Sequence, residues 1–373
     1  GSTTTYTVTY TLNGCTNTAS GTVTVGGNPS VVVNSASICS GQSATLTATP
    51  NPGGGTYSWV PGGQTTQSIT VSPSSTTTYT VTYDLGGCIA TGSGTVTVNP
   101  NPVPSFTYIA ACPNQPSSFN NTSTILSGTM SYQWSFPGAT PNSSTQTNPS
   151  NIVYPSGGSY TVTLVVTSNN GCVDSITQQI VIPYLPVADY SVTTVCEGTQ
   201  TCYTDLSSVQ NGNIVGWQWV FGDGSPVDNT QNPCHLFNLC GTYNTTLIAT
   251  SNSGCAVSVT KQVVVECLPT ASFTTNNVCR DNFAVFNNTS SGGSSYSWNF
   301  GDGFGTSTQQ NPTYLYNAPG TYNVMLTVNT VGGCSDVFTL PITIFPEPTA
   351  NFNFSNVCEG NATNFTDAST IGG

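Results

Sequence analysis

The sequence predicts an all-β chain of tandem β-sandwich domains arranged as an extended rod. Small polar residues alternate with apolar or aromatic ones at a period of two, as in "TYTVTY" and "TYNVMLTV". Turns such as "NNGC" and "VGGC" separate these runs, and no stretch has the periodicity of a helix. Short alternating strands at regular spacing are typical of β-sandwiches, and Thr, Val and Tyr favour strands.

Internal repeats define the domain organisation. "GSTTTYTVTYTLNGC" (1–15) matches "SSTTTYTVTYDLGGC" (74–88), and residues 272–293 match residues 351–373. Because the first and last of these segments match only part of a repeat, we expect the sequence to be part of a longer protein. Proline-rich linkers such as "NPNPVP" and "FPEPT" are expected to stiffen the joints. The predicted segments are the end of a repeat at 1–27, whole domains at 28–99, 100–184, 185–268 and 269–346, and the start of a repeat at 347–373.

The charge composition excludes several functions. Only 4% of the residues are charged, and Lys261 and Arg280 are the only basic ones, against 14 acidic residues. Nucleic-acid binding needs clustered Lys and Arg, as does binding to an anionic membrane surface. No run of about 18 apolar residues occurs, so we expect no membrane insertion. With one histidine and one lysine, a nucleophile and its base cannot be assembled, so we expect no enzyme activity and no catalytic residues.

Three motifs recur in the same order in two neighbouring repeats. "WVFGDG" (219–224) and "WNFGDG" (298–303) are followed by "NPCHLF" and "NPTYLY", and then by "CGTYNTTLIAT" and "PGTYNVMLTV". The segment 100–184 departs from the pattern, because "WSFPGA" replaces the aspartate turn. These motifs resemble the PKD domain family, whose members are Ig-like sandwiches, and the resemblance implies tandem Ig-like/PKD β-sandwiches.

Segment 28–99 lacks the motif but contains "GTYSWVPGG" and "TTYTVTYDLGGC". It is similar to the Ig-like repeats that adjoin PKD domains in large surface proteins of gliding and related Bacteroidetes. That resemblance implies secretion and a surface stalk or adhesin role. "DSI" (174–176) resembles a short O-glycosylation motif of Bacteroidetes, which makes Ser175 a candidate glycan site.

The aspartate turns are predicted to be structural. Trp298 and Phe300 share one face of a strand and would fill the core, while flanking glycines permit positive φ and the aspartate closes the hairpin through backbone N–H groups. Calcium is the alternative cofactor for these turns, but it needs six to eight oxygens and no DxDxDG pattern surrounds the aspartates. The turn residues are Gly222, Asp223, Gly224, Gly301, Asp302 and Gly303, of which Asp223 and Asp302 are weak calcium candidates.

The single histidine and a recurring tyrosine are also interpreted as structural. His235 occupies a motif position that Tyr314 takes one repeat later, so we expect packing; the alternative is a metal site of Cys234, His235 and Cys240, which lacks a fourth ligand. The recurring tyrosine resembles the tyrosine corner of Ig-like folds, whose hydroxyl bonds to backbone, with sugar stacking as the alternative. These tyrosines are Tyr6, Tyr79, Tyr160, Tyr243 and Tyr322.

The 14 cysteines indicate an oxidised, extracellular disulfide framework. Each repeat carries one cysteine before its second strand and another after its penultimate strand. The cysteine after the penultimate strand of one repeat always lies 24 residues before the cysteine that precedes the second strand of the next repeat. This constant interval indicates fixed spacing between domains. These pairs are Cys15 and Cys39, Cys88 and Cys112, Cys172 and Cys196, Cys255 and Cys279, and Cys334 and Cys358.

Three pairing schemes remain open. In an Ig-like topology the two cysteines of one repeat lie near opposite ends of the sandwich, beyond the roughly 5.5 Å between Cα atoms that a disulfide needs. This favours bonds between neighbouring repeats (39–172, 112–255, 196–334) over bonds within a repeat (39–88, 112–172, 196–255, 279–334) and over the 24-residue pairs. Four extra cysteines fall on strands expected to be neighbours, which predicts Cys202–Cys234 and Cys240–Cys267.

The combined expectation is a non-enzymatic structural region of a large extracellular adhesin or stalk. Its partners would be other copies or repeats of the same protein, with surface glycans or proteins bound through distal domains. Two alternatives remain: carbohydrate-binding or spacer modules of a secreted hydrolase, and a subunit of a self-assembling filament or sheath.

Overall fold

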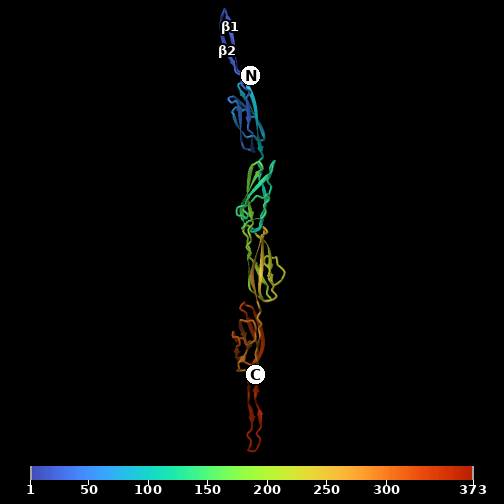
Figure 1. Ribbon diagram of the computed structural model, residues 1–373. Coiled ribbons are helices and arrows are strands. Elements are labelled where there is room, and N and C mark those ends of the chain that lie inside the picture. Colours follow the sequence, from blue (N-terminus) through green and yellow to red (C-terminus); the bar gives the residue numbers. More distant parts are fainter. Residues whose placement is uncertain (1, 372–373) are drawn as a thin grey trace. The chain divides into compact units, whose positions relative to one another are not determined.

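The computed structural model describes residues 2–371, and every regular element in that range is a β-strand (Figure 1). The chain divides into two compact units, residues 1–183 and 184–373. Each unit contains two β-sandwich domains, so the predicted all-β class with tandem sandwiches is confirmed. Among the described residues there is no helix with the length and hydropathy needed to cross a membrane.

The first unit begins with an isolated hairpin and continues with domains 1 and 2. The hairpin pairs β1 with β2. Domain 1 packs sheet β4-β9-β8-β6 on sheet β3-β5-β7, and domain 2 packs sheet β13-β12-β15-β16 on sheet β10-β11-β14. The strands of this unit are β1 (Thr4–Leu12), β2 (Cys15–Val23), β3 (Ser30–Val33), β4 (Ala36–Cys39), β5 (Ala44–Asn51), β6 (Thr56–Val60), β7 (Ser68–Val71), β8 (Thr77–Leu85), β9 (Cys88–Asn99), β10 (Phe106–Ile109), β11 (Pro116–Asn121), β12 (Met130–Ser135), β13 (Ser143–Ser144), β14 (Ile152–Val153), β15 (Gly158–Ser168) and β16 (Val173–Ile182).

The second unit contains domains 3 and 4 and ends with a partial repeat. Domain 3 packs sheet β18-β23-β22-β20 on sheet β17-β19-β21; domain 4 combines sheet β25-β32-β31-β28-β29 with the pairs β24-β27 and β26-β30. The strands of this unit are β17 (Tyr190–Val192), β18 (Val195–Cys196), β19 (Thr201–Asp205), β20 (Ile214–Val220), β21 (Cys234–His235), β22 (Gly241–Ser251), β23 (Ala256–Glu266), β24 (Phe273–Thr274), β25 (Val278–Cys279), β26 (Ala284–Val285), β27 (Asn287–Asn288), β28 (Ser295–Asn299), β29 (Thr306–Ser307), β30 (Thr313–Tyr314), β31 (Gly320–Asn329), β32 (Ser335–Phe345), β33 (Pro348–Thr349), β34 (Phe352–Phe354), β35 (Phe365–Asp367) and β36 (Thr370–Ile371).

One buried tryptophan forms the centre of each domain core. Trp59, Trp134, Trp219 and Trp298 are the largest fully buried side chains of domains 1 to 4. Each indole N–H donates to a backbone carbonyl of a following loop, at 2.9 Å to Thr66, 3.0 Å to Gln146, 3.0 Å to Thr230 and 2.9 Å to Gln309. Burial of the ring and its hydrogen bond together hold the loop to the core. Trp298 and Phe300 are both buried, as predicted.

In domains 1, 3 and 4 a short strand near the start of the domain switches sheets and pairs parallel with the last strand. This occurs for β4 with β9, β18 with β23, and β25 with β32. The pairing places Cys39 beside Asn99, the last residue of β9. Because β9 begins at Cys88, the two cysteines of domain 1 lie at opposite ends of a 12-residue strand.

Candidate functional site

In domain 4 the aspartate turn is closed by Asp302, which accepts hydrogen bonds from three donors. Oδ1 accepts the backbone N–H groups of Phe304 at 3.0 Å and Gly305 at 2.8 Å. Oδ2 accepts the hydroxyl of Tyr314 on β30. The Tyr314 ring stacks on Phe300, with ring centroids 4.1 Å apart. The carboxylate therefore fastens the hairpin to a strand of the opposite sheet as well as to its own turn.

The glycine that precedes the aspartate is required by both conformation and space. Gly301 has a φ of +82°, which side-chain-bearing residues rarely adopt. A Cβ at this position would also lie 2.4 Å from the backbone oxygen of Asn323. The turn consequently approaches β31 more closely than any other residue type would permit.

Domain 3 repeats this arrangement with a histidine. Asp223 Oδ1 accepts the backbone N–H of Ser225 at 3.0 Å, and its Oδ2 lies 2.7 Å from Nε2 of His235. The His235 ring stacks on Phe221 with centroids 4.0 Å apart and planes at 4°. His235 thus takes the place of Tyr314, as a packed side chain that holds the aspartate. The sequence predicted the turn but not the aromatic side chain that holds its aspartate. That side chain, His235 or Tyr314, lies 12 residues after the aspartate in each domain.

Domain 2 lacks both members of the pair. Its turn has Gly138 where the other domains have the aspartate. The position equivalent to His235 and Tyr314 is Ile152, because these three residues pair with Ser117, Thr201 and Ala284 at the same place in the neighbouring strand. Ile152 is buried. Domain 2 therefore has an apolar residue at this position, and it has no aspartate that would need a hydrogen-bond donor there.

Hydrogen bonding controls the ionisation of these groups. Partial burial alone would raise the pKa of Asp223, but hydrogen bonds from Ser225 and His235 outweigh it and lower that pKa to about 2. For Asp302 the same competition, with donors Tyr314, Gly305 and Phe304, also lowers the pKa. The bond to Asp302 in turn raises the pKa of Tyr314 to about 12. Both aspartates are thus held as anions, the form that accepts these bonds.

The described part of the chain offers no set of side chains that could bind a metal ion. Between residues 2 and 371 no group of three or more His, Cys, Asp or Glu side chains is placed to hold a metal ion. The alternative site of Cys234, His235 and Cys240 is wrong, because both sulfurs form disulfides with other partners and cannot act as thiolate ligands. Calcium at Asp223 or Asp302 would have to displace the donors already bound to each carboxylate.

Three of the five recurring tyrosines make the hydrogen bond of a tyrosine corner. The hydroxyls of Tyr160, Tyr243 and Tyr322 donate to the backbone oxygens of Ser156, Leu239 and Ala318, each four residues earlier, at 2.9, 2.7 and 2.9 Å. Each of these tyrosines is the third residue of its strand. In domain 1 Tyr79 is buried in the core instead, and Tyr6 on the isolated hairpin is exposed.

Disulfides join each domain to the next within both units. Cys39 is bonded to Cys172, and Cys196 to Cys334, each with Cα atoms 5.6 Å apart. This is the pairing between neighbouring repeats. The within-repeat and 24-residue schemes are wrong for these four cysteines. The reason is the parallel pairing of the sheet-switching strand: Cys39 and Cys88 are separated by the length of β9, roughly 36 Å at about 3.3 Å per residue.

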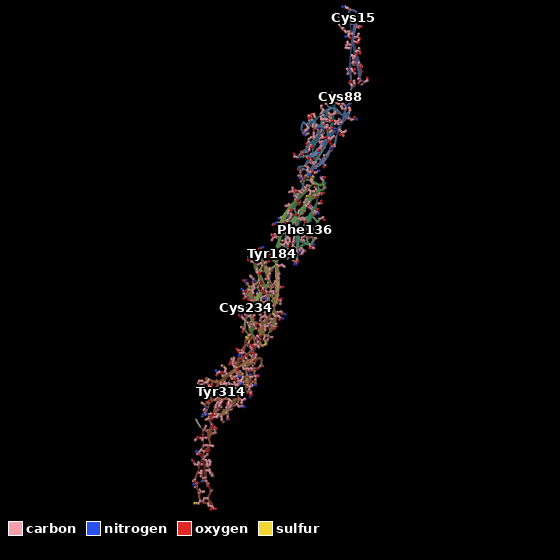
Figure 2. The ribbon with its side chains drawn as sticks, turned by 90° about the vertical axis from the view of Figure 1, so that its left-hand side faces the viewer. Cys15, Cys88, Phe136, Tyr184, Cys234 and Tyr314 are labelled. Carbon is pink, nitrogen blue, oxygen red and sulfur yellow. A yellow bond between two sulfur atoms is a disulfide. The ribbon has the colours of Figure 1, made fainter. Side chains whose placement is uncertain are left out.

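The remaining cysteines fall into two groups. Cys112 and Cys255 are disulfide-bonded, and their predicted pairing with each other stays a prediction. Cys88 and Cys279, included among the predicted disulfide cysteines, are free thiols, as are Cys15 and Cys358. Among residues 2–371, the cross-repeat scheme provides none of these four cysteines with a partner. Figure 2 shows Cys15 at the tip of the β1–β2 hairpin and Cys88 at one end of domain 1.

Domain 3 carries two additional internal bonds. Cys202 and Cys234 are direct cross-strand partners on β19 and β21, and they are bonded to each other. Cys240 precedes β22 and Cys267 follows β23, two paired strands, and these cysteines also form a disulfide. The candidate glycan site Ser175 lies on β16 with an exposed side chain; its modification stays a prediction.

The fold and these sites define a class: tandem Ig-like β-sandwich modules stabilised by disulfides. Residues 97–183, 184–267 and 268–344 each match the PKD domain family, and together they cover more than half of the sequence. The chain therefore belongs to the PKD domain family. Domain 1 lies outside the three matched ranges, apart from the end of β9.

Several solved structures are similar to parts of the chain. The PKD1 domain of Vibrio anguillarum Epp is 25% identical, with 23% of this chain and 98% of that chain covered and a TM-score of 0.21. The PKD1 domain of the Vibrio cholerae metalloprotease PrtV is 28% identical, with 22% and 96% covered and a TM-score of 0.20. The eight N-terminal Ig domains of Down Syndrome Cell Adhesion Molecule are 13% identical, and 95% of this chain covers 52% of that one with a TM-score of 0.36.

We expect the clasp between Asp302 and Tyr314 to behave as one unit. Asp302→Ala should lower the free energy of unfolding of domain 4 by about 1–3 kcal/mol, because it leaves three donors without an acceptor, two of them partly buried. Tyr314→Phe should cost about 1 kcal/mol. The double variant should lose less than the sum, by about 0.5 kcal/mol or more, since both variants remove the same bond. Urea unfolding followed by hydrogen exchange in β28 and β31 measures these losses; strict additivity would contradict the clasp.

Acid should destabilise domain 3 through Asp223. Its pKa is about 2 in the folded protein and close to 3.9 in an unfolded chain. A lowered folded-state pKa contributes stability that is complete above about pH 4 and is lost as the pH falls towards 2. Melting temperatures of domain 3 between pH 6 and 2 should therefore fall more steeply for the parent than for Asp223→Asn. Parallel curves for the two proteins would show that this carboxylate does not contribute.

Proposed function

We propose that the chain is a structural, non-enzymatic repeat region of a large extracellular cell-surface adhesin or stalk, which bears tension along its length. The observation that carries this function is the bonding of each repeat to its neighbour through Cys39–Cys172 and Cys196–Cys334. Bonds inside one domain would protect only that domain. Bonds between domains create a covalent route that bypasses the domain cores.

That route is short. Force applied at the two ends would enter through residues 1–39, cross to Cys172, follow the chain to Cys196 and cross again to Cys334. The 24-residue stretch between Cys172 and Cys196 is the only stretch of peptide between the two bonds on this route. The constant 24-residue spacing thus gives every joint a force-bearing segment of equal length. The segments inside each loop carry no load until a disulfide breaks.

Disulfides and composition support an extracellular location. Ten cysteines among residues 2–371 are disulfide-bonded, which requires an oxidising compartment. Lys261 and Arg280 are the only two sites for trypsin-like proteases in 373 residues, which suits an exposed protein. The partners we propose are neighbouring repeats of the same protein, with surface glycans or proteins bound through distal domains.

Single-molecule stretching of the full chain from its two ends tests the mechanical function. The two bonds enclose sequence separations of 133 and 138 residues. At about 3.4 Å per residue, they should withhold roughly 450 Å and 470 Å of extension, so reduction should lengthen the fully stretched molecule by roughly 900 Å.

The variant Cys196→Ala/Cys334→Ala provides the matched control. Without reductant it should gain roughly 270 Å. The missing bond enclosed a sequence separation of 138 residues, but Cys202–Cys234 and Cys240–Cys267 lie inside that loop and still withhold separations of 32 and 27 residues. Removing Cys202–Cys234 should add no extension to the oxidised molecule, because that bond lies inside the Cys196–Cys334 loop. An oxidised parent that stretches as far as the reduced one would rule out this function.

Two other functions make different predictions. Carbohydrate-binding or spacer modules of a secreted hydrolase would give specific signals on a glycan array, which a stalk segment without its distal domains would not. A subunit of a self-assembling filament or sheath would form polymers visible by electron microscopy and would scatter light increasingly with concentration. We expect the chain to bind no array glycan and to remain monomeric.

A further inference from the structure

The final residues of the chain form half of a repeat whose apolar side chains are uncovered. Phe352 and Phe365 are 55% and 66% exposed and contact each other with ring centroids 5.5 Å apart. Their counterparts in domain 4 are Phe273 and Phe286, which are 2% and 0% exposed because Trp298 and the second sheet cover them. A repeat that begins at β33 therefore needs further strands of the same kind to bury this face.

The first hairpin is the complementary half. Tyr6, Val8 and Tyr10 on β1 are 65–66% exposed. The matching residues on β8 are Tyr79, Val81 and Tyr83, which are 7%, 0% and 0% exposed in the core of domain 1. Exposed apolar side chains that line one face of an isolated hairpin indicate a surface that is covered in the complete protein.

Cys279 occupies a position that is bonded in the preceding domains. In the parallel strand register, Cys279 lies opposite Phe345 at the end of β32, as Cys39 lies opposite Asn99 and Cys196 lies opposite Glu266. Cys39 and Cys196 are each bonded to a cysteine of the next domain. Cys279 is an exposed free thiol. Two bonded examples in the same chain thus show what this position binds.

The element that binds there has a defined form. Cys172 and Cys334 end the turn between the last two strands of their domains, and each follows a glycine with positive φ, Gly171 at +82° and Gly333 at +87°. At the joint between domains 1 and 2, Cys172 Sγ lies 4.0 Å from the carbonyl oxygen of Asn99. At the joint between domains 3 and 4, the turn packs so tightly that a Cβ on Gly332 would lie 2.4 Å from Cγ of Glu266.

Domain 4 has an open pocket at the end of its last strand, where the other joints hold the turn that carries the cysteine. A cavity of about 540 Å³ lies beside the end of β32, directly after Phe345. Asn99, Glu266 and Phe345 are equivalent by register, so this cavity lies where the glycine–cysteine turn is seated at the two occupied joints. Its lining includes Arg280, Pro319, Pro346, Glu347 and Pro348.

We propose that this end of domain 4 is a docking site for the glycine–cysteine turn of a following repeat in the same polypeptide, and that Cys279 forms a disulfide with the cysteine of that turn. The partner is a continuing repeat, because β33 to β36 already form its first strands. Two thiols lose two protons and two electrons as the S–S bond forms, and a disulfide oxidant of the thiol–disulfide exchange class accepts them. By the spacing of the existing bonds, the partner lies 133–138 residues beyond Cys279.

The same rule assigns a role to Cys88. It follows Gly87, which has a φ of +93°, and ends the β8–β9 turn, so it is the counterpart of Cys172 and Cys334. Cys88 is therefore the turn cysteine that docks on a preceding repeat. This docking is independent of the stalk function, because it concerns which atoms bond and not what load they carry.

An extended chain tests the docking site directly. Residues 269–346 are repeated after Glu347 in place of 348–373, which positions a second copy of the β31–β32 turn at the natural spacing. The second copy carries Val331→Ala, at a residue 94% exposed, so that its turn peptide has a distinct mass, and Cys279→Ser, so that only the first-copy Cys279 can bond. Mass spectrometry of non-reduced peptic peptides should recover Cys279 linked to the second-copy turn cysteine, with Cys196–Cys334 as the internal control for folding. A folded chain in which Cys279 is alkylated as a free thiol would overturn the assignment. Covalent dimers through Cys279 and Cys88 would overturn the choice of partner, since the occupant would then be a second molecule.

A second variant separates docking from bonding. In the extended chain with Cys279→Ser, docking alone should bury the second-copy turn cysteine, as Cys172 and Cys334 are buried at 0% and 1% exposure. Its thiol should then react with iodoacetamide roughly tenfold or more slowly than the exposed Cys15 of the same molecule. Equal rates would show that the turn does not dock.

Discussion

Replacing Trp298 with alanine should lower the free energy of unfolding of domain 4 by about 3–5 kcal/mol, the largest effect expected of any single substitution in that domain. Trp298 is buried against Phe273 and Phe286, with ring centroids 4.9 and 5.6 Å away. The variant loses these contacts, leaves a cavity, and removes the donor that binds the backbone oxygen of Gln309. Since a domain is stable by about 5–15 kcal/mol in total, much of its stability would be lost.

Hydrogen exchange of β31 and β32 measures this effect in the intact chain. The amides of these strands should become exchangeable at a lower urea concentration, while those of β15 and β16 in domain 2 should be unchanged. Phe304→Ala is the matched control, because Phe304 lies in the same domain but is 92% exposed. Its loss should stay within about 0.5 kcal/mol. A Trp298→Ala loss as small as that of the control would mean that the tryptophan is not the centre of the core.

The variant Cys196→Ala/Cys334→Ala should lose a stabilisation on the order of 4–5 kcal/mol, the second of the two largest effects. The bond closes a loop with a sequence separation of 138 residues, and most of its contribution comes from the restriction of the unfolded chain. Replacing both cysteines avoids leaving one buried thiol without its partner. Equilibrium unfolding of domains 3 and 4 in urea, under non-reducing conditions, provides the measurement.

The bond inside domain 3 supplies the comparison. Cys202 and Cys234 are only 32 residues apart, so their removal should cost about 1 kcal/mol less than removal of the long-range bond. The long-range variant should also unfold domains 3 and 4 independently of each other, whereas the short-range variant should keep them coupled. Equal losses and retained coupling in both variants would show that the inter-domain bond does not constrain the unfolded chain.

Much of the fold followed from local patterns. Alternation at a period of two identifies strands because successive side chains point to opposite faces, and the buried residues of β8, β15 and β31 follow that alternation. The turn at Asp302 was also predictable, since its Oδ1 bonds lie within three residues of the aspartate. The partner Tyr314 was not, because it reaches Asp302 only through the packing of two sheets.

The cysteines separate what sequence determines from what tertiary structure decides. The 24-residue spacing, the oxidised framework that the 14 cysteines indicate and the division into repeats follow from the sequence alone, because they depend on residue types and intervals. Which cysteine bonds to which depends on a strand that switches sheets and pairs parallel with the last strand, which places Cys39 at the end of domain 1 opposite Cys88. That placement brings Cys39 within 5.6 Å of the Cα atom of Cys172, 133 residues away, and only the packed sandwich brings together residues so distant in sequence.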